Sequence, residues 1–319
     1  MNGFNNGAVL APPNGGSLLE YTNRASWNPF NKTLMILGGA HTSSSTGCNE
    51  TRFVKYTEST NTWTSTLPNP CPNFDNAFGG GIGHAYNHNA IDSSRGDFYH
   101  RQYASGKVMV FTHATQTWSQ IPPIPRAFQV AGALEYFPNR NSLVFLDGEH
   151  GVWEFDLDSN AWTQRASTGN GGFTPQLTGL GPYHNLSQYS SLCQCVLLGG
   201  GGGSQALYKF GSNGSITRMA NTPFDLEIPQ SSAGTAWGSV MTVDPASGLI
   251  LAWNSNGTGY EFNPVANTYR TTGLKAPFTP TTAGGIFNVV AAPVADHGVV
   301  IFVVSGSSSK VFLYKHSTN

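Results

Sequence analysis

Residues 83–103, "GHAYNHNAIDSSRGDFYHRQY", gather three histidines, two arginines and three tyrosines in a chain with only 10% charged residues. Imidazole and phenol side chains can act as general bases and acids, and a guanidinium group can pair with a carboxylate through two parallel hydrogen bonds. His84, Tyr86 and His88 alternate along the chain, so an extended backbone would present all three on one side. The stretch either lines a site or forms polar strand ends, and the fold decides between these interpretations.

The overall composition excludes two classes of partner. The 319 residues carry a formal net charge of −1, and neither half contains the basic stripe that nucleic-acid binding needs. The most apolar run, residues 289–304, is interrupted by Pro293, Asp296 and His297, so no membrane span is predicted. The N-terminus lacks the basic and apolar regions of a signal peptide. Abundant Gly and Pro with little Lys nevertheless favour an extracellular location, or one at a virion or cell surface.

An internal repeat predicts the fold. An aromatic residue, a short polar turn and a second aromatic seven positions later recur as Tyr56/Trp63, Phe111/Trp118, Phe155/Trp162 and Phe262/Tyr269, with a weaker copy ending near Ile216. Each copy is typical of a β-hairpin. More apolar strands such as "NSLVFLDG" and "GALEYF" precede these hairpins, which makes four strands per unit and a period of about 50 residues. That period indicates propeller blades.

The Gly-Gly, Tyr and Trp pattern of these units resembles that of kelch-type β-propellers along nearly the whole chain. We therefore predict an all-β, six-bladed, kelch-like propeller that forms a single domain over residues 1–319. The last unit lacks an outer strand, and "NNGAVLAPP" near the N-terminus resembles blade ends, so residues 6–12 are expected to close the ring. The predicted blades lie near residues 21–67, 84–122, 130–166, 183–220, 236–273, and 286–316 with 6–12.

Propeller topology predicts which residues meet. In a four-stranded blade the loop that enters the first strand and the loop that leaves the second lie on the same face, because strand direction alternates. By this rule, five candidate catalytic residues lie on the rim of that face: His84, Tyr86, His88, Arg101 and Tyr103. The same rule adds a candidate substrate-binding group: His41, His100, His150, Tyr183 and His184.

A rim rich in His, Tyr and Arg but poor in carboxylates suits β-elimination on a uronic-acid polysaccharide. Arg101 would neutralise the sugar carboxylate through a bidentate grip. The base for the C5 proton would be His84 or His88. The acid for the leaving oxygen would be Tyr86 or Tyr103.

The residue types of the same stretch resemble those in the central clefts of propeller-fold polysaccharide lyases such as the ulvan lyases. This resemblance implies a polysaccharide lyase, although those enzymes usually have seven blades and this chain has six repeats. A glycosidase is not favoured, because it needs two carboxyl groups and Glu149 is the main carboxylate expected on the rim.

Two other functions remain open. The same rim would suit a non-catalytic module that binds glycan or protein, since aromatic and amide side chains are common sugar contacts. The cofactor is unknown, but a divalent metal is a third hypothesis, with four candidate ligands: His84, His88, His100 and His184. We expect a polysaccharide or glycan partner, and a monomer unless the chain belongs to a larger assembly.

The four cysteines allow limited inference. Cys193 and Cys195 would share one side of an extended strand, which is a poor geometry for a mutual disulfide. Cys48 and Cys71 could close one loop through a disulfide, or remain buried thiols.

Overall fold

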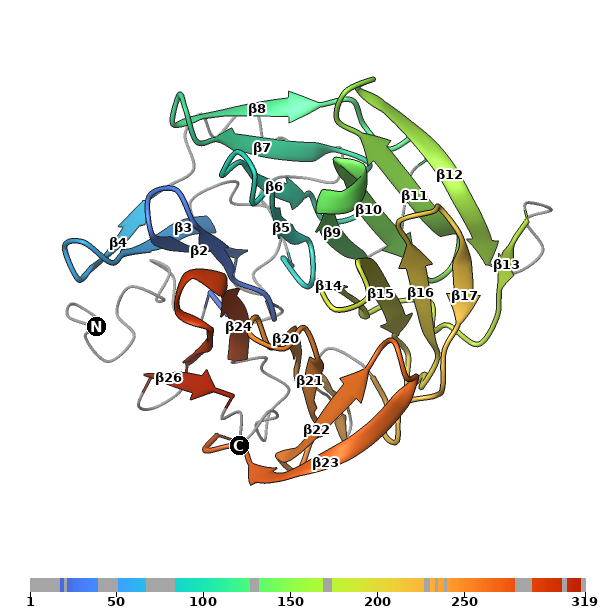
Figure 1. Ribbon diagram of the computed structural model, residues 1–319. Coiled ribbons are helices and arrows are strands. Elements are labelled where there is room, and N and C mark those ends of the chain that lie inside the picture. The colour runs from blue at the N-terminus through green and yellow to red at the C-terminus, as the bar shows by residue number, and fades with distance from the viewer. Residues whose placement is uncertain are drawn as a thin grey trace.

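Six radial sheets surround a central axis, which confirms the all-β, six-bladed propeller (Figure 1). A computed structural model of the protein describes residues 18–19, 22–39, 51–66, 84–126, 132–168, 174–226, 230–232, 235–237, 240–278, 289–305 and 309–316. No helix within these ranges is long and apolar enough to cross a membrane. Short 3₁₀ turns at Pro138–Arg140 and Ala295–His297 connect the first two strands of blades 3 and 6.

The first three blades are antiparallel sheets whose strands follow chain order from the axis outward. Blade 1 contains β1 (Ser26–Asn28), β2 (Thr33–Gly39), β3 (Thr51–Thr57) and β4 (Thr62–Thr66). Blade 2 contains β5 (Asn89–Ile91), β6 (Phe98–Arg101), β7 (Val108–Thr112) and β8 (Thr117–Ile121). Blade 3 contains β9 (Ala133–Phe137), β10 (Ser142–Asp147), β11 (Gly151–Asp156) and β12 (Ala161–Thr168), and β13 (Gln176–Leu177) pairs in parallel with β12.

The other three blades follow the same order. Blade 4 contains β14 (Asn185–Ser190), β15 (Cys195–Gly200), β16 (Leu207–Gly211) and β17 (Ile216–Arg218). Blade 5 contains β20 (Val240–Val243), β21 (Ile250–Trp253), β22 (Thr258–Asn263) and β23 (Thr268–Lys275), and the hairpin of β18 (Gln230–Ser232) and β19 (Thr235–Trp237) precedes it. The described strands of blade 6 are β24 (Val289–Val294), β25 (Val299–Val304) and β26 (Lys310–Lys315).

The repeated aromatic pair is the outer hairpin of each complete copy. The two aromatics are cross-strand neighbours in the pairs Tyr56–Trp63, Phe111–Trp118, Phe155–Trp162 and Phe262–Tyr269. Each intervening turn contains one residue with positive φ: Asn61, Gln116, Asn160 and Asn267. Asn tolerates this left-handed conformation better than most residues, which explains the Asn-rich turns. The register predicted from the seven-residue spacing is therefore confirmed.

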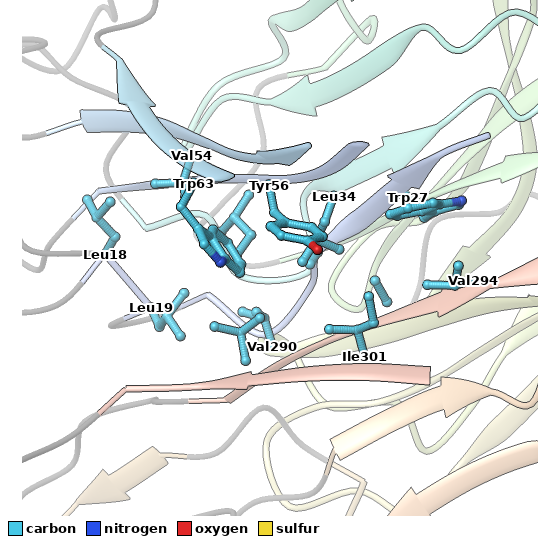
Figure 2. Packing of buried hydrophobic residues seen from close by; sticks show 14 residues of the cluster. Leu18, Leu19, Trp27, Leu34, Val54, Tyr56, Trp63, Val290, Val294 and Ile301 are labelled. Carbon is cyan, nitrogen blue, oxygen red and sulfur yellow. The ribbon is translucent and has the colours of Figure 1, made fainter. Parts of the chain in front are cut away.

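Hydrophobic clusters fill the interfaces between neighbouring blades. Figure 2 shows the cluster between blades 1 and 6, in which Leu34 and Trp63 lie near Val290 and Ile301. A backbone bridge also joins Arg24 to Ala291. These contacts hold the first and last blades together. The expected closing strand at residues 6–12 lies outside the described residues.

One expectation about the cysteines is wrong. Cys193 and Cys195 form a disulfide, with their Cα atoms 5.2 Å apart. In an extended strand these atoms would be separated by roughly 6.5 Å. Cys193 instead lies in the turn before β15, and Gln194 between the two has a positive φ of 49°, so the chain curls and brings the sulfurs together. Cys48 and Cys71 lie outside the described residues.

We predict that the outer-strand tryptophans differ in their contribution to stability. Trp118 is 6% exposed and packs edge-on against Phe53 of blade 1, whereas Trp162 is only partly buried. Trp118→Ala should lower the free energy of unfolding by about 3–5 kcal/mol, and Trp162→Ala by less. Urea denaturation monitored by far-ultraviolet circular dichroism measures both. Equal losses would contradict the packing described here.

A buried cation crosses the propeller axis. Arg24 of blade 1 pairs with Glu135 of blade 3, and both side chains are largely buried. Its Nη1 donates to Leu134 O at 2.9 Å and lies 3.4 Å from Asn87 Oδ1 of blade 2. The same nitrogen donates to Ser187 O of blade 4 at 3.3 Å. One side chain thus connects four of the six blades.

We predict that Arg24→Met destabilises the protein by about 3–5 kcal/mol, because it leaves Glu135 as a buried charge without its partner. The double variant Arg24→Met/Glu135→Gln should lose less, since the uncompensated charge is gone. Chemical denaturation of both variants gives the comparison. A single variant as stable as the wild type would show that the ion pair does not hold the blades together.

Candidate functional site

The predicted catalytic residues form one group, which we call the blade-2 cluster: His84, Tyr86, His88, Arg101 and Tyr103. His84 precedes β5 and Tyr103 follows β6, and these strands are antiparallel neighbours. Their rings consequently meet, with centroids 4.9 Å apart. His84 Nδ1 and the Tyr86 hydroxyl share a hydrogen bond. The residues that precede β5 and those that end or follow β6 therefore lie on the same face of the propeller, as the topology predicted.

Blade 4 contributes to the same cluster. The His184 ring lies 5.1 Å from that of Tyr86, and the Tyr183 ring lies 5.2 Å from that of His184. Tyr86 and His184 both have positive φ, at 35° and 66°. Positive φ is uncommon for non-glycine residues, but it also occurs here in ordinary turns such as those at Asn61 and Gln116, so it is not specific to the cluster. The structure thus brings two predicted substrate-binding residues to the catalytic candidates.

Exposure divides the cluster into two layers. His84 and Tyr103 are half-buried and Tyr183 is 42% exposed. His88 and Arg101 are completely buried beneath them. A bidentate grip on a substrate needs an accessible guanidinium, so the predicted grip of Arg101 on a sugar carboxylate does not fit this arrangement.

Arg101 is held by three groups. Its Nη1 donates to His88 Nε2 at 3.2 Å, and its Nε donates to Ser105 O at 2.9 Å. Its guanidinium carbon lies 5.1 Å from the centre of the Phe145 ring of blade 3, within the range of a cation–π contact. Because Nε2 of His88 accepts, the proton of its neutral ring is on Nδ1, and that buried N–H has no hydrogen-bond partner among the described residues.

Burial and charge set the protonation states. Burial, and then the charge of Arg101, lower the pKa of His88 well below its ordinary value. The same two causes lower the pKa of His100 to about 3. Burial lowers the pKa of Arg101 to about 10 against the opposing effect of Asp147, so the guanidinium stays charged at neutral pH. Burial raises the pKa of Tyr103, and Arg101 opposes that shift.

Two further predicted residues, His100 and His150, are among the described residues, and the His100 ring lies 6.2 Å from that of His88. His100 is completely buried, and its Nδ1 donates to Asn89 Oδ1 at 2.7 Å. Asn89 in turn donates to Leu37 O of blade 1. His150 lies 3.1 Å from Asp147 of blade 3. His41 lies outside the described residues.

Two of the histidines predicted as metal ligands, His88 and His100, are poorly arranged for a shared metal. His88 Nε2 faces the Arg101 cation, and His100 points toward Asn89. Within the described part of the chain, no three His, Cys, Asp or Glu side chains form a group that could hold a metal ion.

Residues around the axis were not predicted from the sequence. Asn87 lies between Tyr86 and His88 in the chain, and its Oδ1 accepts from the backbone and hydroxyl of Ser187 as well as from Arg24. Arg24 and Glu135 also line a cavity at the other end of the channel. The sequence did contain a hint of this buried charge. Glu135 lies within the otherwise apolar strand "GALEYF" of a chain with few charged residues.

Comparison with known proteins supports the fold. No family model and no curated protein matched the chain. A solved structure of unknown function from Bacteroides thetaiotaomicron aligns over 92% of this chain and 70% of its own, with 13% identity and a TM-score of 0.52. A fungal alcohol oxidase of the AA5 family, solved with copper, aligns over 92% and 72%, with 12% identity and a TM-score of 0.53. At such identities the likeness extends to the propeller alone.

The buried histidines predict acid sensitivity. Their pKa values in the folded state lie below the unfolded value of about 6.5, so the unfolded chain binds more protons as pH falls below 6.5. The stability contributed by their neutral burial is complete above pH 6.5. Below pH 6.5, each buried histidine should lower the free energy of unfolding by about 1.4 kcal/mol per pH unit.

Free energies of unfolding measured between pH 7.5 and 5.0 test this. His100→Gln should reduce the slope, whatever its stability at pH 7.5. The matched variant Tyr99→Phe changes the neighbouring residue of β6, and burial raises the pKa of that phenol further above this pH range, so the slope should stay unchanged. If the free energy of unfolding changed equally steeply with pH in the wild type and in His100→Gln, the lowered pKa of His100 would be contradicted.

Proposed function

We propose that this propeller acts on an acidic polysaccharide at the blade-2 cluster and cleaves it by β-elimination. The main support for this proposal is the position of His84 and Tyr103, one candidate base and one candidate acid. Their rings lie side by side, both are half-buried, and the buried Arg101 cation lies beneath them. A polysaccharide substrate of this kind would lie outside the cell, so the proposal includes an extracellular, virion-borne or cell-surface location.

Each accessible group has one role. His84 removes the C5 proton of the uronate, and its hydrogen bond with Tyr86 orients the ring. The C4–O4 bond breaks as the C4=C5 double bond forms, and Tyr103 gives its proton to the departing oxygen. The proton that His84 took up then returns to the Tyr103 phenolate, which restores both groups, so no external reactant is consumed.

Arg101 supports this reaction without touching the sugar. Because it is buried, water does not screen its charge strongly, and its field favours the negative charge that develops on the uronate carboxylate. The same charge opposes the rise in the pKa of Tyr103 caused by burial, which keeps the phenol a better acid.

Glycan binding without cleavage is the second candidate function. It is favoured by the exposed ring of Tyr183 beside His184 and by the burial of the cluster's arginine. A binding module needs aromatic contact surface but no accessible acid or base.

Incubation with ulvan, alginate, pectate and glycosaminoglycans, followed by absorbance near 235 nm, separates the two candidates. Elimination creates an unsaturated uronate that absorbs there, whereas binding alone does not. Tyr103→Phe keeps the ring and removes the acid, so turnover should fall by about 10²–10⁴-fold with little change in affinity. Tyr260→Phe, at a partly exposed tyrosine of blade 5, is the matched control and should leave turnover unchanged. Measurable affinity with no absorbance from the wild type would overturn the lyase proposal in favour of binding.

A further inference from the structure

A cavity opens at the end of the central channel opposite the blade-2 cluster. It has a volume of about 230 Å³ and receives residues from all six blades. Its rim is built from the ends of the innermost strands and the turns that follow them, including Pro29, Ser93, Pro138, Ser191 and Pro245. His84 precedes β5 whereas Ser93 follows it, so this mouth and the blade-2 cluster lie at opposite ends of the channel.

The inner end of the cavity carries no net charge. Arg24 and Glu135 are its charged lining residues, and they pair with each other. Both carboxylate oxygens of Glu135 are also occupied by backbone N–H donors, from Tyr136 and Tyr189. An ionic ligand would have to break this pair, so the site favours an uncharged one.

Polar side chains also line the cavity. Ser93 and Ser191 are exposed residues at its rim and carry hydroxyl groups. Gln188 also lines the cavity, and the one hydrogen bond assigned to its side chain is long, at 3.5 Å to Tyr189 O.

The rest of the wall is largely apolar. Trp27, Tyr136, Val243 and Pro293 are among its residues. A dry cavity of about 150 Å³ is enough to hold a benzene ring, so this volume can enclose one six-membered ring with substituents. A ligand that fits must present an apolar face to the wall and hydroxyl groups to Gln188 and the exposed serines of the rim.

We propose that this cavity is a binding site for a neutral saccharide ring. A pyranose combines the required features, because its C–H faces are apolar, its edge carries hydroxyls that both donate and accept, and it has no charge. The site is separate from the blade-2 cluster, since the Arg24 side chain and its partners lie between the two mouths. The proposal therefore does not depend on the lyase proposal.

Titration of the full chain with D-galactose, L-rhamnose and D-xylose, followed by ligand-observed NMR and thermal melting, tests the inference. D-glucuronate, D-glucosamine and cyclohexanol are the charged and apolar comparison probes. Ser93→Phe adds a bulky ring at an exposed position of the cavity rim and should weaken saccharide binding by at least tenfold. Gln188→Leu removes an amide group that lines the cavity and should weaken it about three- to tenfold. Ser159→Phe, in the exposed outer turn of blade 3, is the matched control and should bind like the wild type.

Binding of at least one neutral sugar that is lost in Ser93→Phe and retained in Ser159→Phe supports the proposal. No binding of any neutral sugar, equal binding by Ser93→Phe, or tighter binding of a charged probe or cyclohexanol would overturn it. Action on acidic polysaccharides should be unaffected by Ser93→Phe, so the failure of either proposal can be recognised separately.

Discussion

The rest of the propeller is arranged around one buried ion pair, Arg24 with Glu135. A charge removed from water must find several partners, and Arg24 finds them on blades 2, 3 and 4 while its own backbone bridges to blade 6. The hydrophobic clusters between blades are non-directional and would tolerate small rotations. The ion pair is directional, so it fixes how the innermost strands meet at the axis.

This arrangement divides the channel into two chemically different mouths. On one side the blade-2 cluster places His84 and Tyr103 above a buried cation and a neutral His88. Buried groups of this kind are held rigidly by packing, which suits a site that must meet its ligand without reorganising. On the other side the charges are paired, and the cavity offers hydroxyl and amide groups among apolar walls. Among the described residues, histidines gather at the first mouth, and the lining of the cavity at the second mouth contains none.

Similarity of fold at this level of identity does not establish similarity of chemistry. The fungal alcohol oxidase shares the propeller at 12% identity, yet two histidines that could have been metal ligands in this chain face Arg101 and Asn89 instead. Propellers support many functions because their loops vary independently of the blades. The function of this protein must therefore be argued from its own side chains.

The sequence by itself determined the six blades, their register and the meeting of His84 with Tyr103. These features follow from local signals, namely the seven-residue aromatic spacing and the alternation of strand direction within one sheet. Only the tertiary structure decided that Arg101 is buried, because its cover includes Phe145 from the next blade. It also decided the cavity and the Arg24 pair, which unite residues more than 100 positions apart. The Cys193–Cys195 disulfide depended on a single left-handed residue, a conformation that residue type alone does not reveal when that residue is glutamine.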